Sequence, residues 1–402
     1  MKRVLHIISQ KPSDTGSGVY LQNLIAHGRY NNDSQAIVFG INNNECIEID
    51  IPEKWRYKIQ FETDKLPFPI VGMSDVMPYK SSVFSELNEN DNEVLINSYK
   101  RVVKRAILDF KPDLIFCQHL WLITSVTRTL VEELDLLIPV YGFCHGTDIR
   151  QLSLSGYHRE KVIFGCKNLD KIFALNEFQI DELEEKYNYE RSKIHVVGNG
   201  YNSDYFYKNN VKKKNEGRHK IIYAGKLSYS KGVMSLIRSF KELDNKEFEL
   251  YIAGNGHGSE YMSILEAIED IENIYYLGKL SQSELGDCFR SSDIFVLPSF
   301  YEGLPLVIIE AIACGLKVVC TNINGISKWI SKYTDDSNII SFVDLPQMLK
   351  IDKPSPNDLS DFEIRLTNSI LKVHNSKIDN LDYEFLNELS WKEIFGKLNR
   401  LL

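Results

Sequence analysis

Short apolar runs alternate with helix-like segments along this 402-residue chain, and the alternation occurs in two series. Brief apolar runs bounded by turn residues are typical of the buried strands of parallel sheets. The first series covers residues 4–197 and the second covers 220–320, with a polar stretch at 201–219 between them. This pattern predicts an α/β protein with two tandem doubly wound parallel-sheet, Rossmann-like domains.

The length of the chain supports a division into two domains, because one hydrophobic core rarely serves so many residues. We expect an N-terminal domain over residues 1–205 and a C-terminal domain over 206–385. The tail at 384–402 contains Trp391 and Phe395, which predicts an amphipathic closing helix over about 386–402.

Two segments match no regular pattern. Residues 42–92 are rich in Pro, Asn and Asp, and their prolines interrupt any long element, so we expect an irregular insertion near an acceptor cleft. Residues 349–383 are polar, with helical character near 359–375.

Composition excludes several classes of protein. The net charge of −8 argues against general nucleic-acid binding, which needs a basic surface. The seven cysteines are scattered without metal-ligand spacing, which is typical of reduced thiols in the cytosol. The N-terminal apolar run is too short for a signal peptide, and no run reaches the length of a membrane-spanning helix. We therefore expect a cytoplasmic protein.

The predicted helix at 94–110 has a basic face, formed by Lys100, Arg101, Lys104 and Arg105. Such a face can contact an anionic acceptor or the inner face of a membrane, or it can simply be solvated. The sequence leaves both interpretations open.

The stretch at 293–315 carries the strongest chemical signal. Residues 293–299 predict a buried strand, Pro305 suits the first turn of a helix, and Gly315 suits the left-handed position after the helix end. The helix start can hold phosphate, because its free N–H groups and dipole favour an anion.

Two acids in this stretch are candidates for binding a nucleotide sugar. Glu302 lies in the loop, where it can hold hydroxyls of a sugar, and Glu310 lies in an otherwise apolar helix, where it can accept the hydroxyls of a ribose. A purely structural Glu310 is the alternative, but a buried carboxylate without a partner is costly.

Other loops at the carboxyl ends of predicted strands add candidates. Gly16 and Gly18 precede a helix without completing a dinucleotide fingerprint, so a tight turn without a ligand is the alternative. His145 begins the polar sequence His-Gly-Thr-Asp at the end of another strand, where open α/β sheets bind ligands. Lys226 and Lys231 lie in the first loop of the second series.

These residue types suit the departure of a nucleoside diphosphate. Two lysines and a helix N-terminus would stabilise the charge that the leaving diphosphate gains, each donor contributing on the order of 3 kcal/mol. The chain has no Walker loop, GxSxG, HExxH or kinase signature.

The spacing of Glu302 and Glu310 resembles the Glu–seven residues–Glu motif of retaining family-4 glycosyltransferases with the GT-B fold. Further segments are similar to that family in order and spacing: Gly16–Gly18, His145–Asp148, Val197–Gly200, Gly225–Leu227 with Lys231–Gly232, and Gly254–Gly256. The family usually has Arg where Lys226 stands, and Pro where Gly198 stands. The tail around Trp391 resembles the helix that crosses back onto the first domain.

The resemblance implies two domains facing each other across a cleft, and it implies roles for individual residues. Lys226 and Lys231 would bind the diphosphate, Glu310 the ribose and Glu302 the donor sugar, while His145 would contact the transferred sugar near the reaction centre. Binding positions are also implied for Gly16, Gly18, Asp148, Asn199, Gly225, Gly254, Leu277 (at the base), Gly303 and Leu304 (through backbone N–H groups).

The implied reaction moves a sugar, with retention and without a metal or other cofactor, from a UDP or GDP type of donor to a hydroxyl acceptor in bacterial glycan or glycoconjugate assembly. The acceptor would be a carbohydrate, a lipid-linked glycan or a glycosylated protein. Alternatives are a glycoside phosphorylase or nucleotide-sugar hydrolase of the same fold, and a non-catalytic subunit that binds nucleotide sugar. A dinucleotide oxidoreductase is disfavoured, because the GxGxxG fingerprint is missing.

Overall fold

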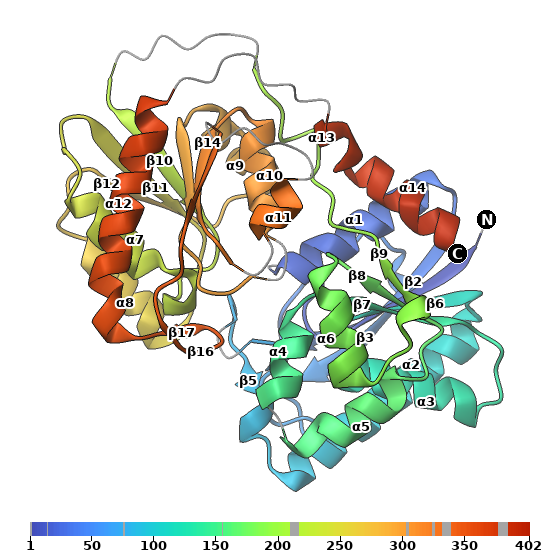
Figure 1. Cartoon of the computed structure of the whole chain (residues 1–402). Helices are drawn as coiled ribbons and strands as arrows, with labels where there is room; N and C mark the ends of the chain where they lie inside the picture. Colours follow the sequence, from blue (N-terminus) through green and yellow to red (C-terminus); the bar gives the residue numbers. More distant parts are fainter. Residues whose placement is uncertain are drawn as a thin grey trace. The chain divides into compact units, whose positions relative to one another are not determined.

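The computed structural model describes residues 2–13, 15–74, 77–154, 156–209, 217–302, 305–323, 326–331, 339–376 and 385–402. The chain forms two compact units, which we call unit 1 (Met1–Asn199 with Ile394–Leu402) and unit 2 (Gly200–Glu393). Each unit is a parallel sheet with helices packed on it (Figure 1). The α/β class and the two parallel-sheet domains predicted from the sequence are confirmed.

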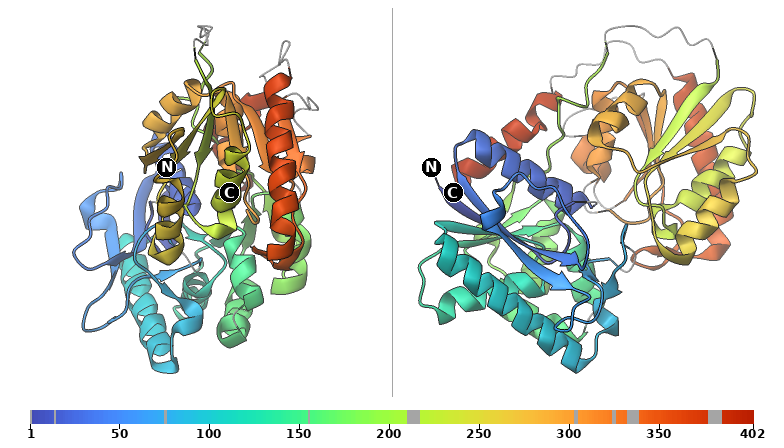
Figure 2. Two further views of the ribbon diagram at one scale, coloured as in Figure 1. Left: turned by 90° about the vertical axis from the view of Figure 1, so that its left-hand side faces the viewer. Right: turned by 180° about the vertical axis from the view of Figure 1, so that it is seen from behind.

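The sheet of unit 1 has seven strands, all parallel to their neighbours. In spatial order they are β3 (Arg56–Phe61), β2 (Ser34–Asn42), β1 (Arg3–Ile8), β6 (Leu114–Gln118), β7 (Val140–Cys144), β8 (Lys171–Ala174) and β9 (Ile194–Val196). The central strands are buried along almost their whole length, because helices cover both faces of the sheet (Figure 2).

The insertion at 42–92 is more regular than we predicted. Strand β3 lies within it and extends the sheet by pairing with β2, and Tyr57, Ile59 and Phe61 on alternate positions of β3 are buried. This alternation is the usual signal of a strand, but the surrounding prolines led us to expect irregular structure. A short pair, β4 (Val71–Gly72) and β5 (Ser82–Val83), completes the segment.

The described residues of the first segment of unit 1 form six α-helices. They are α1 (Gly16–Tyr30), α2 (Glu89–Phe110), α3 (Leu122–Glu133), α4 (Thr147–Leu154), α5 (Gly156–Cys166) and α6 (Phe178–Tyr187). Helices α4 and α5 had no counterpart in our prediction. Gly165 of α5 packs so closely on α3 that a Cβ there would lie 2.2 Å from the Ser125 hydroxyl oxygen.

The larger sheet of unit 2 has six parallel strands. In spatial order they are β12 (Ile274–Gly278), β11 (Phe248–Ala253), β10 (His219–Ala224), β13 (Ile294–Leu297), β14 (Lys317–Thr321) and β15 (Ile340–Val343). The helices of unit 2 include α7 (Val233–Lys241), α8 (Gly258–Ile268), α9 (Gln282–Arg290), α10 (Leu306–Ala313), α11 (Ile326–Ile330) and α12 (Leu359–Asn375).

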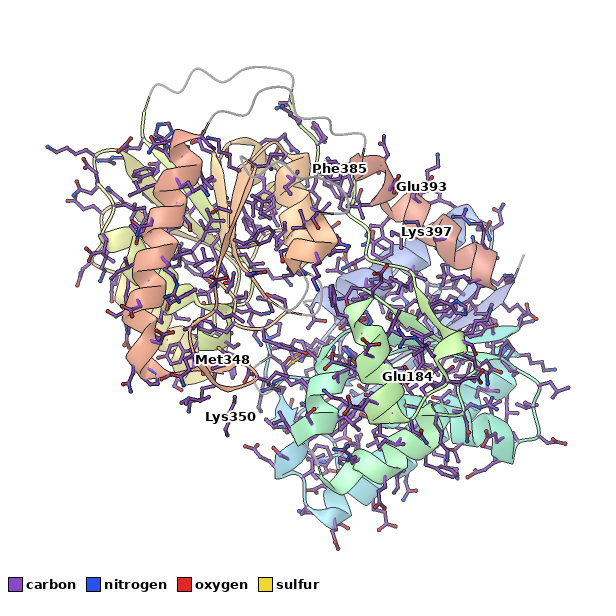
Figure 3. The ribbon with its side chains drawn as sticks, viewed as in Figure 1. Glu184, Met348, Lys350, Phe385, Glu393 and Lys397 are labelled. Carbon is purple, nitrogen blue, oxygen red and sulfur yellow. The ribbon has the colours of Figure 1, made fainter. Side chains whose placement is uncertain are left out.

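Local signals in unit 2 are confirmed in detail. Ser281 and Glu284 form a capping box at the start of α9. Pro305 precedes the first residue of α10, and Gly315 takes the predicted left-handed conformation with φ of +89°. Helix α12 covers the predicted span and packs on α7, β14 and β15. A small hairpin of β16 (Met348–Lys350) and β17 (Lys353–Pro354) precedes it, and Figure 3 labels Met348 and Lys350 there.

The tail forms two helices, α13 (Phe385–Glu388) and α14 (Trp391–Leu401), where we expected one. The break occurs because Tyr201 pairs with the intervening backbone: its N–H donates to Leu389 O (3.0 Å), and Trp391 N–H donates to Tyr201 O (3.2 Å). Within α14, Glu393 is exposed (Figure 3).

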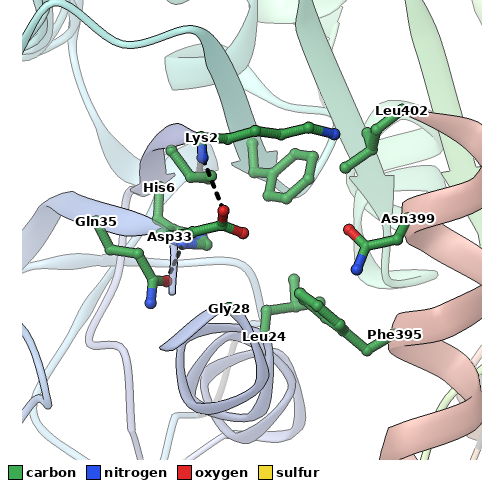
Figure 4. Close-up of a pocket in the computed structure, with 11 residues that line it drawn as sticks. Lys2, His6, Leu24, Gly28, Asp33, Gln35, Phe395, Asn399 and Leu402 are labelled. Atoms are coloured by element: carbon green, nitrogen blue, oxygen red, sulfur yellow. Dashed lines mark hydrogen bonds between the residues drawn. The ribbon is translucent and has the colours of Figure 1, made fainter. Parts of the chain in front are cut away.

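Residues 394–402, which comprise most of α14 and Leu402, belong to unit 1, whose first segment ends at Asn199 rather than at residue 205. The Phe395 ring lies 5.8 Å from the His27 ring of α1. Phe395, Asn399 and Leu402 also line a small pocket at the amino end of β1 and β2, together with His6 and Gln35, which hydrogen-bond to each other (Figure 4).

The described helices include none that is both long and apolar enough to cross a bilayer.

Gly232, in the loop after β10, packs against the backbone at the end of β13, and we expect its replacement to lower the stability of unit 2. Its φ is +66°, and a Cβ there would lie 2.0 Å from Pro298 O. Gly232→Ala should therefore destabilise unit 2 by at least ~2 kcal/mol, from backbone strain and steric overlap together. Gly258→Ala is the matched control, because Gly258 has a similar φ of +81° but open space around it. Equal losses of melting temperature in the two variants would contradict this account.

Candidate functional site

The two loops that follow β10 and β13 in unit 2 are tied together and carry a half-buried ion pair. The loop after β10 contains the short 3-10 turn η4 (Tyr229–Lys231), and Phe300 N–H donates to Ser230 O (2.9 Å). Lys231 Nζ lies 2.6 Å from Glu302 Oε2 and 3.2 Å from Tyr301 O. The structure therefore brings together two residues that the sequence placed in separate loops.

The other oxygen of the Glu302 carboxylate is also engaged. Ser299, which is fully buried, donates its hydroxyl to Glu302 Oε1 (2.8 Å). The side chains of Lys231 and Glu302 keep 21% and 17% of their surface exposed. A ligand can thus reach both charged groups, while Ser299 and Lys231 hold the carboxylate in one orientation. Ser299 was not among the predicted site residues.

Glycines bring the backbones of neighbouring loops into close contact beside this pair. Gly225 N–H donates to Ala253 O (3.1 Å), and Leu227 N–H donates to Asn255 O (2.9 Å). Gly254 has φ of +140°, and a Cβ there would lie 1.8 Å from Gly225 O. Only glycine fits at position 254, so the close packing of these two loops explains why this predicted site residue is a glycine.

The position of Lys226 is set through its backbone. The buried Tyr223 hydroxyl donates to Lys226 O (2.8 Å), and burial, followed by the charge of Glu302, raises the pKa of Tyr223 well above its usual value. Tyr223 is therefore a neutral donor. The Lys226 side chain is half-buried.

Glu310 lies on α10 among apolar residues and is only 7% exposed. Burial raises its pKa to about 8. Within the described part of the chain, no hydrogen bond or ion pair is found for its carboxyl group, so its capacity to bind hydroxyls is unused. The predicted residues Gly303 and Leu304, between Glu302 and α10, lie outside the described residues. Leu277, on β12, is half-buried next to Gly278, whose φ is +68°.

In unit 1, His145 lies directly after β7. Its Nε2 is 2.8 Å from Gln118 Oε1, and the Tyr20 ring meets it edge-on at 5.3 Å. Burial lowers the pKa of His145 to about 3, so the imidazole is neutral at pH 7. Because an amide oxygen can only accept, Nε2 carries the proton and Nδ1 is an acceptor.

A second histidine, His119, adjoins His145, with ring centroids 4.8 Å apart. His119 Nε2 lies 2.9 Å from Ser17 Oγ and 3.0 Å from Gln10 Nε2, and its Nδ1 lies 3.3 Å from Thr147 Oγ1. His119 thereby links the start of α1 to the loop of His145. The sequence does not single out His119, because its partners are distant along the chain and its left-handed backbone, with φ of +68°, leaves no local signal.

Asp148 is placed to position His145 rather than to touch a ligand. It is completely buried, and its carboxylate accepts the backbone N–H groups of Leu120 (2.9 Å) and His145 (3.1 Å). These bonds join the loops that follow β6 and β7. Burial raises the pKa of Asp148 despite these donors.

The remaining predicted residues of unit 1 lie near the start of α1 and the end of the first segment. Gly16 and Gly18 occupy the first turn of α1, where Thr15 Oγ1 accepts Gly18 N–H (3.1 Å). A Cβ at Gly18 would lie 2.7 Å from Ser13 N, whereas one at Gly16 would meet open space. The buried Asn199 Oδ1 accepts no hydrogen bond in the described structure.

The predicted residues thus form two groups, each at the carboxyl ends of the strands of one unit. Lys226, Lys231, Glu302, Gly225 and Gly254 gather in unit 2, where Glu310 lies on the helix that follows β13. In unit 1, Gly16, Gly18, His145 and Asp148 are connected through His119, Gln10 and Ser17.

Comparison with known proteins gives two family matches. Residues 85–205 match the family described as Glycosyltransferase Family 4, and residues 205–350 match the family described as Glycosyl transferases group 1. An uncharacterized glycosyltransferase of Methanocaldococcus jannaschii is 26% identical over 74% of this chain and 77% of its own. Mannosylfructose-phosphate synthase of Agrobacterium fabrum is 27% identical, but the match covers only 41% of this chain and 40% of that protein.

Among solved structures, sucrose-phosphate synthase of Thermosynechococcus elongatus has the same fold, with a TM-score of 0.67 over 100% of this chain and 98% of that one, at 15% identity. The fold is therefore GT-B. The chain is a glycosyltransferase, with a family-4 segment followed by a group 1 segment.

Proposed function

We propose that the protein transfers a sugar, with retention of configuration, from a UDP or GDP type of nucleotide sugar to a hydroxyl acceptor. The observation that carries the proposal is the arrangement in unit 2. The Lys231–Glu302 pair lies in the loops that follow β10 and β13, and Glu310, which has no partner among the described residues, lies on α10, the helix after β13. A cation, a helix N-terminus and two carboxyl groups match the diphosphate, the sugar and the ribose of such a donor.

The diphosphate would be bound by Lys231, Lys226 and the N-terminus of α10. Lys231 already bonds to Glu302, so a donor would find its ammonium group positioned rather than free to rotate. As the bond to the sugar breaks, negative charge grows on the diphosphate, and fixed positive charge stabilises it most at that point. Lys226, in place of the usual arginine, supplies charge without a bidentate fork. The protein's own cations would make a metal unnecessary.

Glu302 would accept hydroxyl groups of the donor sugar. Its two oxygens accept from Ser299 and Lys231, and each carboxylate oxygen has a second lone pair for a ligand hydroxyl. Because the carboxylate is fixed by these two partners, it would select the position of the sugar hydroxyls.

His145 would contribute from unit 1 as a neutral imidazole. Its Nδ1 could accept a hydrogen bond from a sugar hydroxyl near the reaction centre, while Gln118 holds Nε2. His119 and Asp148 would act through it, by holding the loop in place. The first turn of α1, with Gly16 and Gly18, would bind phosphate.

The proposed acceptor is a hydroxyl group of a carbohydrate, a lipid-linked glycan or a glycosylated protein in bacterial glycan assembly. The basic face of α2 is partly neutralised, since Lys100 pairs with Glu133 (2.6 Å) and Arg105 with Asp109 (3.4 Å). Lys104 and Arg101 form no ion pair with the described residues and would be available to an anionic acceptor or a membrane surface.

Removing Lys231 should weaken nucleotide binding. Isothermal titration calorimetry with UDP and GDP will show which nucleotide binds more tightly. Lys231→Ala should lower the affinity for that nucleotide at least ~10-fold, because one charge-assisted hydrogen bond to the diphosphate is lost. Lys241→Ala, an exposed lysine of the same unit, is the matched control. The proposal fails if neither nucleotide binds the unaltered protein at millimolar concentration.

Replacing Glu302 should affect turnover more than nucleotide binding. Glu302→Gln should leave the affinity for the free nucleoside diphosphate nearly unchanged and reduce the turnover of the nucleotide sugar at least ~100-fold, because its interaction is with the sugar. Consumption of the donor, measured by mass analysis of the products, checks this. An equal loss of diphosphate affinity would show that Glu302 acts by positioning Lys231 and not by binding the sugar.

Glu310→Gln should stabilise unit 2 at high pH. The raised pKa means that folded Glu310 binds a proton up to about pH 8, whereas the unfolded residue releases it near the ordinary glutamate pKa of 4.5. Its unfavourable contribution to stability therefore grows as pH rises from about 4.5 to 8, reaching on the order of 5 kcal/mol. The variant should melt higher than the parent at pH 8.5 and like the parent near pH 4.5.

The same variant also tests the contact with ribose. If Glu310 accepts ribose hydroxyls, the unaltered protein should bind the ribonucleotide more tightly than its 2′-deoxy analogue, and Glu310→Gln should narrow that difference. Undiminished discrimination in the variant would show that Glu310 is a structural acid only.

A further inference from the structure

Three side chains with metal-binding atoms gather at the amino end of the sheet of unit 2, the opposite end from the candidate donor site. They are His219, at the first position of β10, Glu247, one residue before β11, and His374, in the last turn of α12. One ligand atom from each lies within 4.8 Å of the other two. Figure 1 shows the start of β10 and the end of α12 at the same edge of unit 2.

Direct contacts already join the members of this cluster. His374 Nε2 lies 3.1 Å from Glu247 Oε1, and the His374 and His219 rings meet edge-on with centroids 4.3 Å apart. The backbone N–H of His219 donates to Glu247 O (2.7 Å), which keeps β10 and the start of β11 in register. The three side chains therefore come from segments that the fold holds together.

We propose that this cluster binds one divalent transition-metal ion of the zinc type. Two imidazoles and one carboxylate are a ligand set that Zn²⁺ uses, with water in a fourth position. Imidazole nitrogen favours Zn²⁺ over Mg²⁺ or Ca²⁺, which prefer oxygen ligands alone.

The spacing suits such an ion after small side-chain rotations. Two ligand atoms bound tetrahedrally to zinc lie about 3.4 Å apart, given bond lengths near 2.1 Å. The Glu247–His374 distance of 3.1 Å is already close to that value. The side chains of His374, His219 and Glu247 are 16%, 31% and 47% exposed, so an ion can enter from solvent.

A second carboxylate is placed to support His219. Asp293 Oδ2 lies 3.9 Å from His219 Nδ1, and Lys220 N–H donates to the same oxygen (2.8 Å). If His219 binds the ion through Nε2, its Nδ1–H points toward Asp293, the carboxylate–histidine–metal arrangement that orients many ligating histidines.

The neighbouring cation of Lys317 is engaged elsewhere. Lys317 Nζ donates to three carbonyl oxygens at the end of α12, those of Val373 (2.7 Å), His374 (3.1 Å) and Ser376 (2.5 Å). Its charge is thus directed at the helix C-terminus, where a cation is favourable. Glu247 and Asp293 leave the surroundings negative enough for a divalent ion.

Binding would stabilise unit 2. The ion would connect β10 to the long helix α12, and closing a long loop in this way favours the folded state. This inference is independent of the proposed transfer reaction, because the cluster lies at the other end of the sheet from Lys231 and Glu302.

The test uses the full-length protein after treatment with EDTA and removal of the chelator. Isothermal titration with Zn²⁺ should show one equivalent bound at micromolar affinity, with a rise in the melting temperature. Co²⁺ as a probe should give visible absorption bands of a tetrahedral site. His219→Ala and His374→Asn should each weaken Zn²⁺ binding at least ~10-fold, and Asp293→Asn should weaken it about 10-fold.

His257→Ala is the matched control, since His257 is an exposed histidine of the same unit outside the cluster. His374→Asn keeps a side-chain donor for Glu247, so a loss of binding without a loss of melting temperature in EDTA separates metal ligation from a structural role. The inference is overturned if Zn²⁺ fails to bind the unaltered protein, or if His219→Ala and His374→Asn bind it as tightly as His257→Ala does.

Discussion

The ion pair between Lys231 and Glu302 is the interaction on which the proposed donor site depends. It connects loops that follow two neighbouring strands of one parallel sheet, and the backbone bond from Phe300 to Ser230 holds those loops at one separation. A half-buried ion pair adds little to stability by itself, because desolvation offsets much of the attraction. Its value here is geometric, since it fixes one cation and one carboxylate before any ligand arrives.

The fold allows this arrangement because parallel strands all end at the same edge. Loops from different parts of the chain therefore meet at this edge, where Gly232 and Gly254 pack closely against the backbone of a neighbouring loop. The position of Glu310 also depends on this edge of the sheet. Glu310 lies on the helix that follows β13 and is buried without a partner in the described structure. Its raised pKa reflects the free-energy cost of burying an ionised carboxylate that binds no ligand.

Much of this organisation could be predicted from the sequence, and the failures have physical causes. Local patterns account for strands β10 and β13 and for the caps of α9 and α10. Apolar runs mark the strands, a capping box starts α9, and Pro305 and Gly315 bound α10. Strand β3 was missed because prolines around it masked a short alternation. His119 and Ser299 were missed for a different reason: their importance comes from partners distant in sequence and, for His119, from a left-handed backbone. Asp148 was expected at a ligand but is buried against backbone N–H groups.

Hydrogen–deuterium exchange of the full-length protein with and without a saturating nucleoside diphosphate tests the central claim most directly. The account predicts that added UDP or GDP protects the peptides covering residues 226–232 and 299–314 of unit 2. It also predicts that the sheet edge carrying His219 and His374 stays unchanged. Protection confined to other parts of the chain, with no change around Lys231, Glu302 and Glu310, would contradict it.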